Sequence, residues 1–220
     1  MTELAVEQAL NLHQSGQLEE AEQAYLDILV DDPGNAEALK LLGVLSCQLS
    51  KFDDGINYIE AAIEVDDTVA EYHYVLGRSY LASGRVEDGI KSLVKAGELD
   101  PSRADVYGVI GDTFQHLQNF PEALNAYERA VALDVSNVNY QVGAGLSAVF
   151  SGDNETATYY LEKAASVNDT VPQIFYGLSL VSSASGDTKA AQDLMSKAIK
   201  LDPKNPEYLR LFDEYASASA

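Results

Sequence analysis

Residues 70–103 read AEYHYVLGRSYLASGRVEDGIKSLVKAGELDPSR, and the spacing of small and large side chains in this stretch decides the fold. Gly77 lies in a run where apolar residues recur every three or four positions, and Gly89 and Ala96 lie in a second such run. Both runs predict helices, and their small residues would let the two helix axes approach closely. Gly84 separates the runs, at a place where a helix can end with a positive φ. The stretch therefore predicts two helices joined by a short turn.

The same pattern repeats every 34 residues along the chain, without insertion, beginning at Thr2. Small residues fill 17 of the 18 positions equivalent to Gly77, Gly89 and Ala96, and Ile28 is the exception. Neither helix of a pair can bury its apolar face alone, so the pairs are expected to stack on one another. The six repeat units are 2–35, 36–69, 70–103, 104–137, 138–171 and 172–205.

The remaining residues, 206–220, are expected to form a capping helix with a frayed tail. Asn205 is a suitable N-cap residue, and Pro206 suits the first helical position. The apolar side chains that would cover the last repeat unit are Tyr208, Leu211, Phe212 and Tyr215. The tail ASASA, residues 216–220, is expected to fray, as chain termini commonly do.

This pattern resembles the tetratricopeptide repeat (TPR) family, whose signature is W-x2-L-G-x2-Y, then A-x3-F, then P. In residues 70–103 the signature appears as Leu76-Gly77-x2-Tyr80, Gly89-x3-Leu93 and Pro101, although no unit holds the family's Trp. The resemblance covers residues 2–205. It implies an all-α fold, a TPR α-solenoid in which helix-turn-helix repeats form a right-handed superhelix, with a C-terminal capping helix.

Composition excludes several functional classes. The 220 residues include 35 acidic and 14 basic side chains, for a formal net charge of −21. This charge argues against binding to nucleic acid, because phosphate groups are bound by clustered Lys and Arg. No apolar run approaches the roughly 18 residues of a membrane span, so no membrane insertion is expected. The first residues, MTELAVEQAL, lack the positive charge of a signal peptide, and Cys47 is the single cysteine, so we expect a cytoplasmic protein.

Sequence motifs for catalysis and cofactor binding are absent. There is no G-x-S-x-G, H-E-x-x-H, P-loop or G-x-G-x-x-G motif. The three histidines, His13, His73 and His116, occupy different repeat positions and are not expected to converge on a metal. We therefore expect no enzyme activity, no catalytic residues, no metal site and no cofactor.

The resemblance implies that ligands bind a concave surface lined by the first helix of each repeat. Carried over position by position, that surface has an apolar part in the fifth and sixth units and an acidic rim in the first four. The expected groove residues are Tyr74, Arg78, Asp112, Val142, Leu146, Val149, Phe150, Tyr176 and Leu180. The acidic rim consists of Glu3, Glu37, Glu71 and Asp105.

These residues predict a protein or peptide partner that has apolar anchors and basic residues. Exposed apolar patches commonly mark interaction sites. Residues 2–69 hold 15 acidic and 2 basic side chains, so a basic partner would be attracted to this end. The alternative is that a self-packed terminus, or the curvature of the solenoid, covers the apolar residues.

Three functions fit the sequence, and the leading one is a non-enzymatic adaptor or scaffold that binds a partner segment in the concave groove. A second is a TPR arm or accessory subunit of a glycosyltransferase-like transferase that acts on proteins. Ala9-Leu10-x-Leu12-His13-Gln14-x-Gly16 and Leu41-Leu42-Gly43-Val44-Leu45 resemble the first repeats of TPR arms in bacterial glycosyltransferase-like proteins. A third is a self-assembling TPR scaffold, in which the chain associates with itself.

Overall fold

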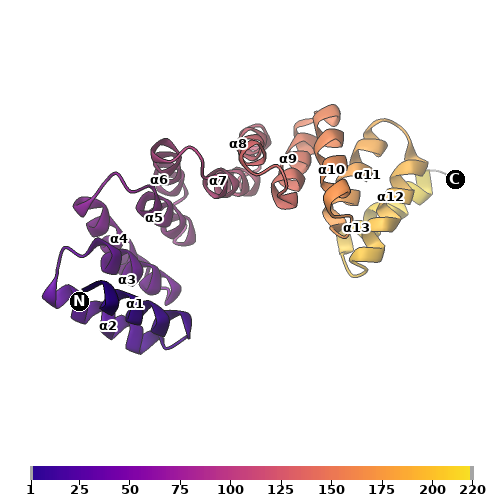
Figure 1. Cartoon of the computed structure of the whole chain (residues 1–220). Coiled ribbons are helices and arrows are strands. Elements are labelled where there is room, and N and C mark those ends of the chain that lie inside the picture. The colour runs from indigo at the N-terminus through magenta and orange to yellow at the C-terminus, as the bar shows by residue number, and fades with distance from the viewer. Residues whose placement is uncertain (1, 219–220) are drawn as a thin grey trace. The chain divides into compact units, whose positions relative to one another are not determined.

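A computed structural model describes residues 2–218, and these residues form thirteen α-helices, arranged as helix-turn-helix pairs with one final helix (Figure 1). The chain divides into two compact units, Met1–Val106 and Tyr107–Ala220, with the boundary inside α7. The predicted all-α repeat fold is confirmed. None of the helices in residues 2–218 is long and apolar enough to cross a membrane.

The N-terminal unit holds three helix pairs and the first three residues of α7, and the C-terminal unit holds the rest of the chain through the last helix. The first six helices are α1 (Thr2–Gln14), α2 (Leu18–Asp31), α3 (Ala36–Gln48), α4 (Phe52–Val65), α5 (Ala70–Ala82) and α6 (Val86–Leu99). The others are α7 (Ala104–His116), α8 (Phe120–Leu133), α9 (Val138–Ser151), α10 (Asn154–Val167), α11 (Pro172–Ala184), α12 (Thr188–Leu201) and α13 (Pro206–Ala218).

The turn inside each pair depends on one residue with a positive φ. Four pairs place glycine there, and each of these glycines has φ 82°: Gly16, Gly84, Gly152 and Gly186. The other two pairs place Ser50 (φ 61°) and Gln118 (φ 57°) in the same position. The left-handed conformation predicted for the glycines is thus confirmed, and two non-glycine residues adopt it at an energetic cost.

We expect Ser50→Gly to stabilise the N-terminal unit by about 1 kcal/mol, because glycine adopts this conformation without the cost that a Cβ imposes. The matched reverse variant is Gly84→Ser, where an added Cβ would have no atom within 4 Å and only the backbone conformation is strained. The urea concentration at the unfolding midpoint, followed by circular dichroism, should rise for Ser50→Gly and fall for Gly84→Ser. A shift in the same direction for both would contradict this explanation.

The turn between pairs is built by an Asp or Asn that directly follows the second helix. The side chain of Asp66 accepts a hydrogen bond from the backbone N–H of Thr68 at 3.0 Å, and Asp100 accepts one from Ser102 at 3.0 Å. Asp134 and Asn168 do the same at 3.2 and 2.9 Å. These local bonds compete with helix continuation, so the helix stops even in units that lack the repeat proline.

Small residues bring the two helices of a pair into backbone contact, as predicted. A Cβ on Gly43 of α3 would lie 2.7 Å from the carbonyl oxygen of Gly55 on α4, and 2.5 Å from Cγ1 of Ile59. The alanines at the third small position, including Ala62 and Ala96, are completely buried. The close helix–helix approach therefore requires residues without larger side chains.

The final helix α13 packs on the last pair. Asn205 accepts hydrogen bonds from the backbone N–H groups of Glu207 and Tyr208 at 3.1 and 3.4 Å, which confirms the predicted N-cap. The apolar face of α13 joins a core cluster with Met195. The helix extends through Ala218, so residues 216–218 are helical where the sequence predicts fraying; residues 219–220 lie outside the described range.

Candidate functional site

The N-terminal unit contains a hollow of about 430 Å³ between α3 and α5, which we call the α3–α5 groove. Leu41 is buried in its floor, and Val44 and Val75 are partly exposed beside it. The full set of lining residues is Lys40, Leu41, Val44, Cys47, Gln48, Glu71, Tyr74, Val75, Arg78, Ser79 and Ala82. The groove thus offers an apolar floor with polar groups on its walls, as ligand sites commonly do.

Tyr74 stands in the wall of the groove with two guanidinium groups near its ring. The guanidinium carbon of Arg103 lies 4.3 Å from the ring centroid, and that of Arg78 lies 5.6 Å from it. Burial raises the pKa of the Tyr74 hydroxyl. Both distances lie within the range of cation–π attraction, which holds the two Arg side chains against the ring.

Arg103 also binds two carboxylates of the predicted acidic rim. Its Nη1 donates to Glu71, and its Nη2 donates to Asp105 at 2.6 Å. The hydrogen bond from Arg103 holds the pKa of Asp105 below its usual value. Arg103 therefore fixes both acidic residues in place beside Tyr74.

A third rim residue is paired in the same way, because Lys40 contacts Glu37 at 2.7 Å. Glu3, on α1, is exposed and forms no ion pair with another described residue. Three of the four predicted rim residues thus already have a cation from the chain itself. A basic partner at this row would therefore have to share these carboxylates with Arg103 and Lys40.

Arg78 is the exception among the cations. Of the Lys and Arg side chains in the described part of the N-terminal unit, it alone forms no ion pair. It is exposed, lines the groove and is oriented by Tyr74. A carboxylate placed in the groove could therefore pair with Arg78 without displacing another carboxylate.

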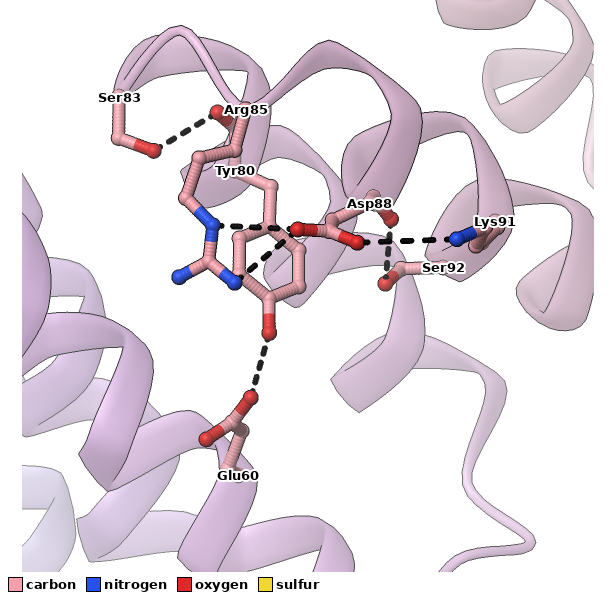
Figure 2. A network of polar contacts seen from close by, with 7 residues as sticks. All are labelled: Glu60, Tyr80, Ser83, Arg85, Asp88, Lys91 and Ser92. Atoms are coloured by element: carbon pink, nitrogen blue, oxygen red, sulfur yellow. Dashed lines mark hydrogen bonds and ion pairs between the residues drawn. The ribbon is translucent and has the colours of Figure 1, made fainter.

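A polar network behind the groove holds α5 against α4 and α6. Figure 2 shows the hydroxyl of Tyr80 directed at Glu60 of α4, to which it donates a 2.5 Å hydrogen bond. Arg85 stacks over the Tyr80 ring at 4.3 Å and binds Asp88 at 3.0 Å. Because Tyr80 neighbours the groove residue Ser79, the network helps to fix the groove wall.

We expect Tyr80→Phe to destabilise the N-terminal unit by about 1 kcal/mol, since it removes the hydrogen bond to Glu60. Burial, followed by that bond, raises the pKa of Tyr80 to about 12. The bond therefore stabilises the fold fully below the phenol's unfolded pKa of about 10, and its contribution is lost as the pH rises towards 12. Urea unfolding at several pH values should show the difference between wild type and variant shrinking above pH 10. A difference that does not depend on pH would contradict the assignment.

The C-terminal unit does not present the predicted apolar stretch as an open surface. Val142 is only 8% exposed and belongs to a core cluster with Leu161, Ala164 and Ile174. Leu146 and Val149 are partly buried against the same cluster. The expectation that Val142 lines a groove is wrong, because α10 and α11 approach α9 closely enough to cover it.

The other predicted apolar residues lie in separate places. Phe150 is 47% exposed, and its ring packs on Phe120 at a centroid distance of 4.9 Å. Tyr176 and Leu180 pack instead against the cluster formed with α13, where Tyr176 lies 5.3 Å from the ring of Tyr208. The alternative in which a terminus covers these residues therefore describes Tyr176 and Leu180 better than an open groove does.

Asp112 has a structural partner. It accepts a 2.5 Å hydrogen bond from the hydroxyl of Tyr127, a residue of α8 that is almost completely buried. Burial, followed by this bond, raises the pKa of Tyr127 well above its usual range. Asp112 thus secures a core tyrosine, and its own side chain remains exposed.

Of the predicted site residues, Tyr74 and Arg78 are brought together in one groove, with Glu71 beside them. The sequence did not predict that Leu41, Val75 and Ser79 line the groove. Each directly follows a residue at a repeat position that the family resemblance assigns to the concave surface. Arg103 was not predicted either, although that residue stands two positions before the predicted rim residue Asp105.

The helix-turn-helix pairs define a class of proteins built from helical repeats. Two tetratricopeptide repeat models match the chain, one over residues 47–104 and one over 104–136 and 172–205. The chain belongs to the tetratricopeptide repeat family. Proteins of this family mediate protein–protein interactions, and no catalytic domain is evident among residues 2–218.

Solved structures with the same fold span most of the chain. MamA is 25% identical, with a TM-score of 0.67, and the match covers 73% of this chain and 94% of that one. YrrB, described as a TPR protein with an unusual peptide-binding site, is 17% identical, with a TM-score of 0.76 and coverage of 86% and 97%. PilF of Pseudomonas aeruginosa is 18% identical, with a TM-score of 0.79 and coverage of 97% of each chain. A comparison with curated protein sequences finds no match.

Proposed function

We propose that this protein is a non-enzymatic adaptor that holds an extended segment of a partner protein in the α3–α5 groove. The observation that carries the proposal is the combination of an apolar floor, about 430 Å³ of space, and the unpaired Arg78 on one wall. YrrB, which shares the fold, is described as having a peptide-binding site, and this supports a peptide as the kind of ligand.

The partner segment should carry an apolar side chain next to a carboxylate. The apolar side chain would lose contact with water over Leu41, Val44 and Val75, which is the main source of affinity in such grooves. The carboxylate would pair with Arg78. We prefer this to a wholly basic segment because Glu37, Glu71 and Asp105 already have cationic partners.

The wider field of the N-terminal unit adds a second requirement. Residues 2–69 carry 15 acidic and 2 basic side chains, so Lys or Arg residues that flank the anchors would speed association at low salt. The close contact at Arg78 determines which segment binds, while the diffuse field is screened beyond about 8 Å at physiological ionic strength.

The experiment is a selection of peptides from a random library on the immobilised chain, followed by measurement of their dissociation constants. Val44→Glu would place a carboxylate over the apolar floor, and we expect it to weaken the selected peptides about tenfold or more. The matched control is Val30→Glu, because Val30 is 80% exposed on α2 and does not line the groove.

The outcome that would overturn the proposal is equal binding to both variants. Peptides rich in Lys and Arg that keep their affinity in Arg78→Gln would instead favour the basic partner predicted from the acidic rim. Circular dichroism of both variants should match that of the wild type, so that lost binding is not confused with lost folding.

A further inference from the structure

A second hollow, of about 590 Å³, lies between α1 and α2 and shares no lining residue with the α3–α5 groove. Its floor is apolar, with Ala9 and Ile28 buried and Leu12 partly exposed. Two carboxylates, of Asp27 and Asp31, stand at its rim. The complete lining is Ala5, Gln8, Ala9, Leu12, Ala24, Asp27, Ile28 and Asp31. We call it the α1–α2 hollow.

The second repeat unit shows what normally fills this position. There, Leu39, Tyr58 and Ala62 are the equivalents of Ala5, Ala24 and Ile28. They form a cluster into which Leu29 packs from α2, the second helix of the preceding unit. In the second unit, this surface is therefore covered by an amphipathic helix that packs an aliphatic side chain against it.

The fourth and sixth units carry a bulky ring and a cation at the equivalent positions. Tyr107 and Arg129 stack at 5.7 Å, and Phe175 and Lys197 stack at 5.5 Å. These two pairs occupy the repeat positions that Ala5 and Asp27 hold in the first unit. The first unit thus lacks both the bulky side chain and the cation, and it offers a small apolar residue and a carboxylate instead.

Charge indicates the kind of helix that fits. Residues 2–35 hold eight acidic side chains and no Lys or Arg. Neither Asp27 nor Asp31 forms an ion pair with another described residue, and Asp27 accepts only a 2.8 Å hydrogen bond from Gln23. A second folded copy would meet this end with its own acidic first unit or with α13, which carries three acidic residues against one Arg. Its basic helix α12 has Ala191, Met195 and Ala198 completely buried in the cluster with α13, so that apolar face is not available to a second copy.

We infer that the α1–α2 hollow docks a cationic amphipathic helix of a partner protein. An aliphatic or aromatic side chain of that helix enters over Ala5 and Ala9, and Lys or Arg residues one turn away pair with Asp27 and Asp31. This surface is separate from the α3–α5 groove, and the inference does not depend on the proposed function.

The probe is a synthetic peptide with the sequence of residues 188–201, TKAAQDLMSKAIKL. It is the sequence of a second helix, it carries three Lys and one Asp, and Ile199 occupies the repeat position of Leu29. Titration into the ¹⁵N-labelled full chain should shift amide resonances of α1 and α2, including those of Gln8, Leu12 and Asp27. A matched peptide with its three Lys replaced by Glu should not produce these shifts.

The decisive variant combines Ala5→Tyr with Asp27→Arg, which introduces the ring and cation found in the fourth unit. We expect it to weaken the peptide about tenfold or more while the amide spectrum of α3 to α6 stays unchanged. Asp31→Lys, which changes only the rim, is the second variant, and we expect weaker binding there as well.

Three results would overturn the inference. One is the absence of shifts in α1 and α2 at about 1 mM peptide, a concentration that would detect even weak binding. Another is unchanged affinity in the double variant or for the Glu-substituted peptide. The third is concentration-dependent self-association of the wild type that the double variant abolishes, which would make a second copy the occupant.

Discussion

Replacement of Tyr127 by Ala should remove most of the stability of the C-terminal unit. Tyr127 is 2% exposed, and its ring fills the space between two helices that carry glycine at the contact. A Cβ on Gly111 of α7 would lie 2.8 Å from the ring, and one on Gly143 of α9 would lie 2.5 Å from it. Loss of the ring would leave a cavity that neither glycine can fill, and we expect a cost of about 4 kcal/mol.

The control for this effect is Tyr127→Phe, which keeps the ring and removes only the hydroxyl that donates to Asp112. Its expected cost is about 1.5 kcal/mol, typical of one hydrogen bond to a charged group. Urea unfolding followed by circular dichroism separates the two contributions. Equal destabilisation by both variants would show that the hydroxyl, and not the packing of the ring, holds these helices together.

Replacement of Gly43 by Ala should destabilise the N-terminal unit by about 2 kcal/mol. The added Cβ would meet the backbone oxygen of Gly55 at 2.7 Å, and backbone can move away only if α3 and α4 separate. Overpacking of this kind costs up to about 3 kcal/mol. Alanine is favoured over glycine inside a helix by about 1 kcal/mol, which offsets part of that cost.

The matched control is Gly34→Ala, in the turn between α2 and α3. Its nearest neighbour would be Oδ1 of Asp32 at 4.0 Å, so we expect a change within about 0.5 kcal/mol. The melting temperature should therefore fall clearly for Gly43→Ala and stay close to that of the wild type for Gly34→Ala. A Gly43→Ala protein at least as stable as the wild type would mean that helix propensity outweighs the close contact.

Sequence reasoning succeeded where the cause is local. The glycine turns follow from backbone sterics at one position, and Gly84 has the expected positive φ. The small positions follow from the distance between paired helices, and they are buried as expected. The cap at Asn205 follows from its side chain and its neighbours along the chain.

The candidate site was harder to predict because it depends on how helices from different units approach one another. Gly177 of α11 lets the side chains of Leu146 and Leu161 pack directly on its backbone, which contributes to covering the apolar face of α9. No periodic pattern within α9 predicts that Val142 becomes part of the core. Gly177 in the next repeat unit is the sequence signal that could have shown that Val142 is covered.

The ion pairs of the acidic rim likewise depend on contacts between repeat units. The sequence identifies Glu71 and Asp105 as acidic residues of successive units, but it does not show which cation they contact. In the structure Arg103 contacts both carboxylates and the Tyr74 ring, so a single cation is shared by two carboxylates on α5 and α7 and compensates one of their two charges. Arg78, predicted only as one groove residue among several, then becomes the cation available to a ligand.

The proposed function places the partner segment in the α3–α5 groove. The most direct measurement is an amide chemical-shift map of the ¹⁵N-labelled chain during titration with a peptide selected on it. We expect the largest shifts on α3 and α5, at Val44, Tyr74 and Arg78, and we expect Val44→Glu to require about tenfold or more peptide to produce them. Shifts that instead centre on Phe150 and Tyr176 in the C-terminal unit, with α3 and α5 unaffected, would contradict it.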